Sequence, residues 1–257
     1  MKILVCIKQV PDMESKFKVA ADGAWYDTSE LAWRMNEYDE YAVEQAVQLR
    51  EKEKDAELTV LTVGGDKAVE PLKKALAMGC DRAAHVVDNE SYKKEPYQIA
   101  GIIAEFAKDK GFDIVFTGMQ SQDRGSAQVG ILAAEMLGIS SISTIVGFSY
   151  ADGAVEVRRE LEGGVKAKVS AKLPVLLTCQ LGLNTPRYPT LPNIMKAKKK
   201  PLDTLAIADL LKVDARQTTE KMFFPEKKGG GIVLEGEVPA LVDKLIALLK
   251  EKTAVLK

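Results

Sequence analysis

The chain has 257 residues, and 46% of them are hydrophobic, so it can bury a full core in one large domain with room for an extension. Its 36 Lys and Arg residues nearly balance its 37 Asp and Glu residues, which gives no reason to expect nucleic acid or an anionic membrane as a partner. No apolar run approaches the roughly 20 residues that span a bilayer.

Five apolar segments rich in Ile and Val indicate buried strands. They lack the strict alternation of a half-exposed antiparallel strand, which favours a parallel sheet covered on both faces. The segments lie at residues 2–9, 57–64, 83–88, 112–118 and 173–180. Helical patterns separate most of them, over 38–54, over 71–79 and after Pro96. This alternation predicts an α/β fold with a doubly wound, mostly parallel sheet.

Two later regions differ from this pattern. Between residues 143 and 172, the turn signals ADGA and EGG with alternating flanks predict added antiparallel strands. A linker rich in Pro and Gly over 221–237 precedes a closing helix with one apolar stripe. The stripe consists of Leu241, Val242, Leu245, Leu248 and Leu249. Because the stripe follows a flexible glycine run, the helix can dock either on this chain's own core or on a partner subunit.

The stretch LNTPRYPTLPNIMKAKKKP, residues 183–201, has four prolines in nineteen residues and ends in a basic run. We expect an extended loop stiffened by its prolines. Leu191 and Ile194 would lie at its tip, where no predicted strand or helix buries them. The simpler alternative is a surface loop whose lysines are only a solvated charge run.

In an open α/β sheet, ligands bind at the carboxyl ends of strands near the point where the strand order reverses. Three loops qualify: the one after the first strand, TVGGD at 62–66 and TGMQSQDRGSAQVG at 117–130. The last enters a helix near Ser126, where free backbone N–H groups suit a phosphate. The chain has no GxGxxG or GxxxxGK[ST] motif, so an ordinary strand-to-helix turn stays an alternative. Asn36 and Asp39 can cap a helix or bond a ligand, and capping is the simpler interpretation.

Catalytic groups are scarce. His85 is the one histidine, and it lies inside a predicted strand, as a satisfied core residue would. No Ser/His/Asp set can be built around it, no carboxylate pair stands out, and the three cysteines lack metal-binding spacing. These features favour a binding protein or carrier over a hydrolase. The apolar run at the N-terminus is too short for an export signal, so we expect a cytoplasmic location and no metal site.

Several phrases of the sequence resemble the electron transfer flavoprotein family, and within it the β subunits, in the same order along essentially the whole chain. They are MKILVCIKQVPD, MNEYDEYAVEQAVQL, ALAMGCDRA, GMQSQDRGSAQVG, VRRELEGG followed by LPVLLT, and LNTPRYPTLPNIMKAKKKP. The resemblance implies a Rossmann-like nucleotide-binding domain over residues 1–200 and a C-terminal arm over 201–257 that packs on a partner α subunit. It also implies an electron carrier without turnover of its own.

The resemblance implies two cofactors. FAD would be shared with the α subunit and held mostly by it, and a structural AMP would lie in this chain. Carried over by position, the AMP site comprises Cys6, Asn36, Glu37, Tyr38, Asp39, Val63, Gly118, Met119, Gln120, Ser121, Gln122, Asp123, Arg124, Gly125, Ser126, Ala127, Gln128 and Val129. These residues include parts of the three loops that the sheet topology indicates.

In the same family, the loop that matches residues 183–201 docks the electron donor. The resemblance implies that an acyl-CoA dehydrogenase or another flavin dehydrogenase binds here, with Leu191 as the anchor, and that a quinone-linked oxidoreductase accepts the electrons. The contacting residues would be Leu191, Ile194, Met195, Lys196 and Lys199. The prolines would keep the loop extended before binding. Steering of acidic partner surfaces would come from Lys196, Lys198, Lys199 and Lys200.

Three alternatives stay open. Bifurcating members of the family hold a second FAD in place of AMP, and their loop resembles DGDTAQVG; here the AQVG half matches, while Arg124 and Gly125 depart from the first half. A further departure from the family is Met13, which stands where several members have a tyrosine beside the flavin.

The second alternative is a stand-alone nucleotide enzyme of the ATP-pyrophosphatase or universal-stress type, which would need a phosphate loop and an acid, base or metal set. A purely structural module would bind no nucleotide.

Overall fold

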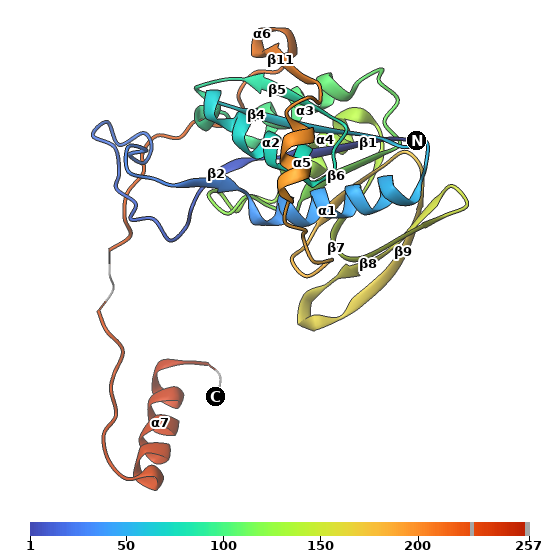
Figure 1. The fold of residues 1–257 in the computed structure, drawn as a ribbon. Coiled ribbons are helices and arrows are strands. Elements are labelled where there is room, and N and C mark those ends of the chain that lie inside the picture. Colours follow the sequence, from blue (N-terminus) through green and yellow to red (C-terminus); the bar gives the residue numbers. More distant parts are fainter. Residues whose placement is uncertain (227–228, 255–257) are drawn as a thin grey trace. The chain divides into compact units, whose positions relative to one another are not determined.

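The five predicted strands form the parallel centre of a nine-stranded sheet in the computed structural model, which describes residues 1–226 and 229–254. They are β1 (Lys2–Ile7), β4 (Glu57–Gly64), β5 (Arg82–Val87), β6 (Ile114–Gly118) and β10 (Val175–Cys179). The other strands are β2 (Gln9–Pro11), β3 (Trp33–Met35), β7 (Ser140–Ala151), β8 (Ala154–Glu160), β9 (Lys166–Lys172) and β11 (Leu202–Ala206). The large sheet has the order β11-β5-β4-β1-β6-β10-β7-β8-β9 (Figure 1). The predicted α/β fold is confirmed.

Helices cover both faces of the sheet. They are α1 (Glu37–Lys52) and α2 (Val69–Met78) on the first face, and α3 (Pro96–Ala107) and α4 (Val129–Leu137) on the second. Short 3₁₀ turns are η1 (Asp66–Ala68), η2 (Ser91–Lys93) and η3 (Glu162–Gly164). Ile3 and Val5 lie in the core of the first face, and Leu4 and Cys6 in that of the second. Both faces of β1 are therefore buried, which explains its unbroken apolar sequence.

The strand order reverses beside β1. The chain passes from β1 to β4 and β5 on one side, and then crosses to β6 on the other side of β1. The backbones that leave the carboxyl ends of β1 and β6 therefore run apart, which leaves room between them at the edge where open α/β sheets bind ligands. The loop at 117–130, selected from the sequence, begins at this edge.

Two polar residues at the start of α1 join the diverging loops. The Asp39 carboxylate accepts from the backbone N–H of Lys8 (2.7 Å) and of Gly118 (3.1 Å). A Cβ at Gly118 would lie 2.2 Å from Asp39 Oδ1, so the bond requires glycine there. The Asn36 side chain donates to the Gln120 carbonyl (2.8 Å) and accepts from the Gln122 N–H (3.0 Å). The expectation of side-chain capping of α1 is wrong for Asn36, because neighbouring loop groups take both of its polar atoms.

The antiparallel strands expected between residues 143 and 172 are present. β7 pairs in parallel with β10 and antiparallel with β8, which pairs antiparallel with β9 at the sheet edge. Along β9, exposed polar residues alternate with half-buried ones. Three of the exposed residues are lysines, and charge on an edge strand disfavours pairing with another chain. The small antiparallel pair of β2 and β3 was not expected from the sequence.

The segment at 183–201, expected to be an extended loop, contains a helix. That expectation is wrong over Leu191–Ala197, which form α5. Thr190 caps this helix, since its hydroxyl accepts from the Asn193 N–H (3.4 Å). Pro192 lies in the first turn, where its fixed φ suits a helix and its missing N–H costs nothing. α5 packs beside α2 (Figure 1), and Ala197 is buried in the core of the first face.

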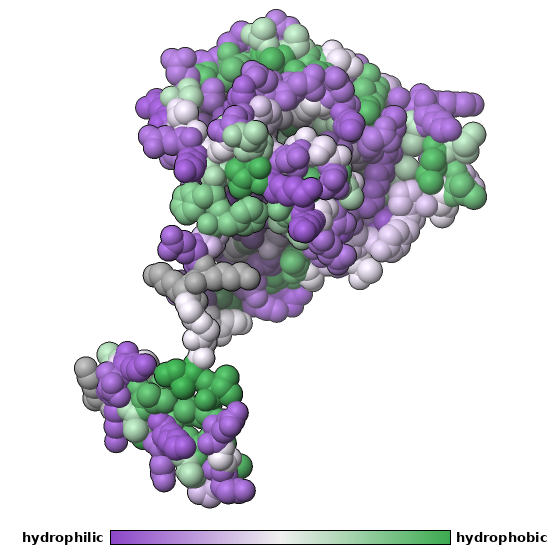
Figure 2. Space-filling model, turned by 90° about the vertical axis from the view of Figure 1, so that its left-hand side faces the viewer, coloured by the Kyte–Doolittle hydropathy of each residue, from purple (hydrophilic) through white to green (hydrophobic). Residues whose placement is uncertain are grey.

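The contacts divide the chain into two compact units, Met1–Met222 and Phe223–Lys257. We expected the arm to begin at residue 201, but β11 is a parallel edge strand beside β5 and, with α6 (Ile207–Leu210), belongs to the first unit. The second unit contains α7 (Val238–Lys252), no residue of which is buried. Hydrophobic side chains gather on one side of this unit (Figure 2). Residues 227 and 228 of the expected linker lie outside the described residues.

We expect Asp39→Asn to destabilise the chain more at pH 5 than at pH 8. Burial raises the pKa of the Asp39 carboxyl from 3.8 to about 7, so the folded chain binds a proton there more tightly than the unfolded chain. The stability that this group contributes is present at low pH and is lost as the pH rises through the folded pKa. The difference in free energy of unfolding between wild type and variant should shrink by about 3 kcal/mol from pH 5 to pH 8. Urea titrations at both pH values measure it.

Asp109→Asn is the matched control. Asp109 is exposed and has a left-handed φ that asparagine also accepts, so this variant makes the same chemical change without the loss of a buried contact and should leave the free energy of unfolding nearly unchanged. A difference between wild type and Asp39→Asn that stays constant or grows with pH would show that the pKa of Asp39 is not raised in the folded chain.

Candidate functional site

A cavity of 640 Å³ opens at the carboxyl ends of β1, β4 and β6. Its volume lies within the range of about 300 to 1,000 Å³ that small-molecule sites occupy. Most of the residues predicted to bind AMP line it: Cys6, Asn36, Asp39, Val63, Gly118, Met119, Gln120, Ser121, Asp123, Arg124, Ser126, Ala127, Gln128 and Val129. The three loops indicated by the sheet topology therefore meet at one cavity.

Four of the predicted residues do not line the cavity. On α1, Glu37 and the Tyr38 hydroxyl accept from the side chains of Gln122 (2.8 Å) and Gln120 (3.2 Å). Gln122 also takes no place in the lining, and Gly125 is exposed with a φ of 59°, which lets the loop turn. These four residues therefore influence the conformation of the loop at 117–130 without contacting the cavity.

The loop at 117–130 leaves a row of backbone N–H groups unused. Within the described residues, the N–H groups of 126–131 donate to no other atom of the chain. Those of 129–131 form the first turn of α4, where no intrahelical acceptor exists. Ala127 has a φ of 53°, a conformation that costs energy for a residue other than glycine. Successive free N–H groups at a helix start form a concave surface that suits an anion such as phosphate.

Lys8 is a site residue that the sequence analysis missed, because it was assigned to the first strand. Its Nζ lies 2.7 Å from Asp123 Oδ2 and 3.4 Å from the Ser121 hydroxyl. Burial lowers the pKa of Lys8, and the Asp123 carboxylate acts in the opposite direction. The ion pair ties the loop at 117–130 to the end of β1. It also neutralises a carboxylate that would otherwise repel a phosphate in the cavity.

Besides Trp33, the cavity lining contains three aromatic residues that were also missed, and we call Trp25, Tyr26 and Tyr92 the aromatic wall. The Trp25 ring centroid lies 4.6 Å from that of Tyr26 and 5.6 Å from that of Tyr92. The Arg124 guanidinium lies 4.7 Å from the Trp25 centroid and donates to the Tyr92 carbonyl. Burial raises the pKa of Tyr26 to about 12, so its hydroxyl stays protonated. Planar surfaces of this kind stack on a nucleotide base. The adjacent Trp25 and Tyr26 were the signal in the sequence.

Cys6 and His85 do not have the surroundings of catalytic groups. Burial raises the pKa of the Cys6 thiol, with Asp39 adding to the effect, so the thiol stays neutral. His85 is buried in β5, where its Nε2 lies 3.1 Å from the Gly64 carbonyl oxygen, as expected of a satisfied core residue. Among the described residues there is no group of acidic, histidine or cysteine side chains that could hold a metal ion. Nor is any described helix both long and apolar enough to cross a bilayer.

The apolar residues predicted to dock a partner lie together on and beside α5. Leu191 is 78% exposed, Met195 59% and Ile194 40%, and the preceding Tyr188 is 89% exposed. We call these four side chains the docking face. None of them lines the cavity.

The basic residues after the docking face differ among themselves. Lys196, Lys198 and Lys199 are exposed. The expectation that Lys200 steers a partner is wrong, because its Nζ donates to the carbonyls of Leu76 (2.9 Å) and Cys80 (2.6 Å) at the end of α2. Carbonyls at a helix C-terminus have no intrahelical donor, which explains why a lysine binds there.

Comparison with known proteins covers both the cavity and the docking face in a single match. A family model described as "Electron transfer flavoprotein domain" matches residues 24–210, which include α5 and most of the cavity lining. "Electron transfer flavoprotein subunit beta" of Bacillus subtilis (strain 168) is 38% identical, and the alignment covers all of both chains. The protein of the same name from Methylophilus methylotrophus is 34% identical over 98% of each chain, and that of Mus musculus is 33% identical over 98% of this chain and 97% of its own. The chain therefore belongs to the family of electron transfer flavoprotein β subunits.

Proposed function

We propose that this chain works with an α subunit as a carrier of electrons from a flavin dehydrogenase, such as an acyl-CoA dehydrogenase, to a quinone-linked oxidoreductase. Its family makes it a subunit of an electron transfer flavoprotein. The docking face is the observation that supports a dehydrogenase as the electron donor. Leu191 is 78% exposed, so this apolar surface does not contribute to the chain's own core. FAD, held mostly by the α subunit, would supply the redox chemistry. The stand-alone nucleotide enzyme is not supported by this family.

The docking face suits a short-lived complex. Burying one leucine side chain in an apolar pocket contributes roughly 1.5 to 3 kcal/mol, which corresponds to about 10- to 150-fold in affinity. Leu191 would supply this anchor, with Ile194 and Met195 beside it. Lys196 and Lys199 would attract acidic residues of the dehydrogenase before contact, an effect that salt weakens.

We propose AMP as the ligand of the cavity. The unused N–H groups of residues 126–131 would hold its phosphate, and the aromatic wall would contact its adenine. Asn36 and Asp39 would act indirectly, since their side chains already bond the backbone of the surrounding loops. A bound nucleotide of this kind has a structural role, because it fills the space between the diverging ends of β1 and β6. A second FAD in the same cavity is the alternative.

The second unit would pack on the α subunit. α7 has exposed apolar side chains, including Val242 and Leu245, and no buried residue. A helix with an unburied apolar stripe gains stability only when another surface covers it. The α subunit would be that surface. We expect the assembled protein in the cytoplasm.

The cofactor content of the assembled protein tests the cavity proposal. The chain is co-expressed with its α subunit, the purified heterodimer is denatured, and the released nucleotides are quantified by chromatography. We expect one FAD and one AMP per heterodimer. Two FAD without AMP would replace the AMP proposal with the bifurcating form, and one FAD with no other nucleotide would make the cavity purely structural.

A substitution among residues 126–131, whose backbone N–H groups are unused, tests the phosphate position directly. Ser126→Glu places a carboxylate beside the proposed phosphate, and we expect the AMP content to fall at least about tenfold through like-charge repulsion. Ser29→Glu makes the same change at an exposed residue outside the cavity lining and should leave AMP unchanged. Equal AMP content in the two variants would argue against phosphate binding at this place.

Leu191→Ala tests the docking proposal. We expect the rate at which a reduced acyl-CoA dehydrogenase reduces the heterodimer, below saturation, to fall about 10- to 100-fold because the anchor is lost. Heterodimer formation and FAD content should not change, and Leu191→Met, which keeps most of the apolar volume, should retain most of the rate. Loss of FAD from Leu191→Ala would instead make Leu191 a structural residue.

A further inference from the structure

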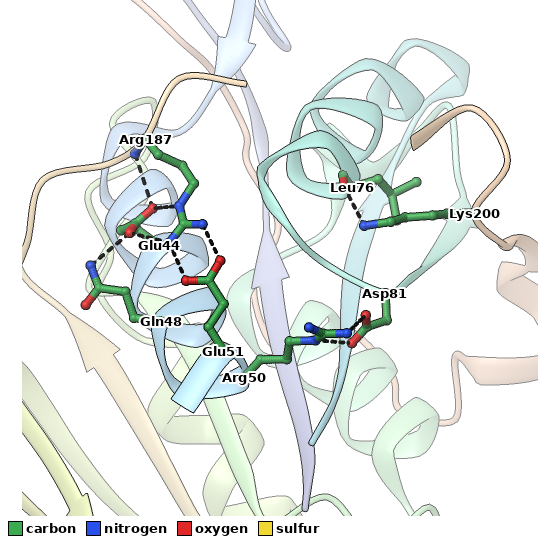
Figure 3. Close-up of polar contacts among 8 residues, drawn as sticks. All are labelled: Glu44, Gln48, Arg50, Glu51, Leu76, Asp81, Arg187 and Lys200. Atoms are coloured by element: carbon green, nitrogen blue, oxygen red, sulfur yellow. Dashed lines mark hydrogen bonds and ion pairs between the residues drawn. The ribbon is translucent and has the colours of Figure 1, made fainter. Parts of the chain in front are cut away.

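The segment between β10 and β11, which carries the docking face, is attached at both ends to helices of the first face. At its start, the Asn184 amide donates to the Tyr41 carbonyl of α1 (3.0 Å). At its end, Lys200 Nζ donates to the Leu76 carbonyl of α2 (Figure 3) and to the Cys80 carbonyl just beyond it. The docking face lies between these two attachments.

The most extensive attachment is that of Arg187 to α1. Its guanidinium binds two carboxylates at once (Figure 3). Nε and Nη2 donate to Glu44 at 2.8 and 3.1 Å, and Nη1 and Nη2 donate to Glu51 at 2.6 and 3.0 Å. The backbone N–H of Arg187 also donates to Glu44 (3.2 Å). Lysine could not reproduce this arrangement, because its ammonium lacks the planar fork that meets a carboxylate with two N–H groups.

The burial of Glu44 keeps the Arg187 side chain in place. Glu44 is only 3% exposed, and the Gln48 amide donates to it as well (2.8 Å). A buried carboxylate needs such partners, so Arg187 cannot turn away without leaving it underpaired. The hydrogen bonds that Arg187 donates to Glu51 and Glu44 raise the pKa of Arg187, and the bond from Arg187 lowers the pKa of Glu51. Arg187 and Glu51 are therefore both charged near neutral pH.

The two helices that hold the segment are also joined to each other. Arg50 of α1 donates to both carboxylate oxygens of Asp81, after α2, at 2.8 and 3.1 Å (Figure 3). Asp81 in turn accepts from the Leu58 N–H in β4 (2.9 Å). The two helices to which the segment is attached, α1 and α2, are thus connected to each other and to β4.

The helix α5 cannot hold its own orientation. It has 7 residues, of which only Ala197 is buried. Isolated helices shorter than about 12 residues are marginal in water, so the orientation of α5 depends on its packing and on the attachments that flank it. Arg187 lies in the non-helical stretch that precedes α5, shortly before Leu191.

We propose that Arg187, held by Glu44 and Glu51, is a positioning residue that fixes the docking face in the orientation that the dehydrogenase binds. The inference rests on the proposed docking function. An orientation set before the encounter reduces the conformational entropy lost on docking. Loss of the attachment therefore weakens association and leaves electron transfer inside the docked complex unchanged.

Glu44→Gln is the decisive variant, because Glu44 is buried and cannot touch a partner itself. The variant is assembled with the α subunit and FAD and assayed with an acyl-CoA dehydrogenase that reduces the unaltered heterodimer. We expect the KM for the heterodimer to rise about threefold to tenfold with kcat unchanged. Arg187→Lys should raise KM by a similar factor. Glu40→Gln is the control: it changes a carboxylate on the same helix as Glu44, removes only the ion pair of Glu40 with Lys74 of α2, and should leave KM unchanged.

A double variant shows whether Glu44 acts through the docking face. Combined with Leu191→Ala, Glu44→Gln should add less than about a twofold change in KM, because an orientation matters only while the anchor is present. Hydrogen exchange on the heterodimer gives an independent readout: the amides of residues 188–197 should exchange faster in Glu44→Gln, and those of β1 and β6 should not.

Each failure has its own meaning. If Leu191→Ala leaves KM unchanged, the docking function itself is wrong. If Leu191→Ala raises KM but Glu44→Gln does not, or if the two effects multiply in the double variant, Arg187 is not a positioning residue. A lower kcat in Glu44→Gln, with faster exchange throughout the sheet, would show a general structural role and overturn the proposal.

Discussion

The arrangement of the whole site depends on one buried carboxylate at the start of α1. Asp39 accepts from N–H groups at the carboxyl ends of β1 and β6, the two strands beside which the strand order reverses. Buried backbone N–H groups need acceptors, and two loops that run apart cannot supply them to each other. A single aspartate supplies both, provided that Gly118 has no side chain in the way. The cavity exists where it does because this contact holds its two sides at a fixed separation.

The periodicity of α1 lets the same helix serve three surfaces. Its first turn carries Asp39 toward the cavity, and one long face is buried in the core. That face consists of Ala42, Val43, Ala46, Val47 and Leu49. Glu44 and Glu51, two turns apart, lie on a further face and meet Arg187. The face toward the core is fixed by hydrophobic burial, which is not directional. The polar contacts of Asp39 and of the Glu44–Glu51 pair are directional. They therefore determine where the cavity loops and the segment between β10 and β11 lie relative to α1.

The sequence was sufficient for the central strands and for the loops at their carboxyl ends, because unbroken apolar runs and strand-to-helix turns are local signals. It was insufficient where a contact joins distant residues. Arg187 and Glu44 are 143 positions apart, so nothing local marks either as a partner. α5 was missed because its prolines suggested a loop, although Pro192 starts the helix and packing against α2 retains it. β11 was missed because an edge strand with exposed residues lacks the apolar run of a central strand. Trp25 and Tyr26 of the aromatic wall come from a segment between β2 and β3 that has little regular structure of its own, and Tyr92 comes from η2, far away in the sequence.

The separation of the cavity from the docking face suits a protein that binds one molecule permanently and another briefly. No side chain of the docking face lines the cavity, so each site can be occupied without displacing a group of the other. A carrier must release its electron donor after each transfer, which limits the area that the complex can bury. Specificity must then come from geometry, because a small interface with a preset orientation loses little entropy on binding and still dissociates quickly. Ion pairs behind the docking face, at Arg187, can supply that geometry without adding to the interface itself.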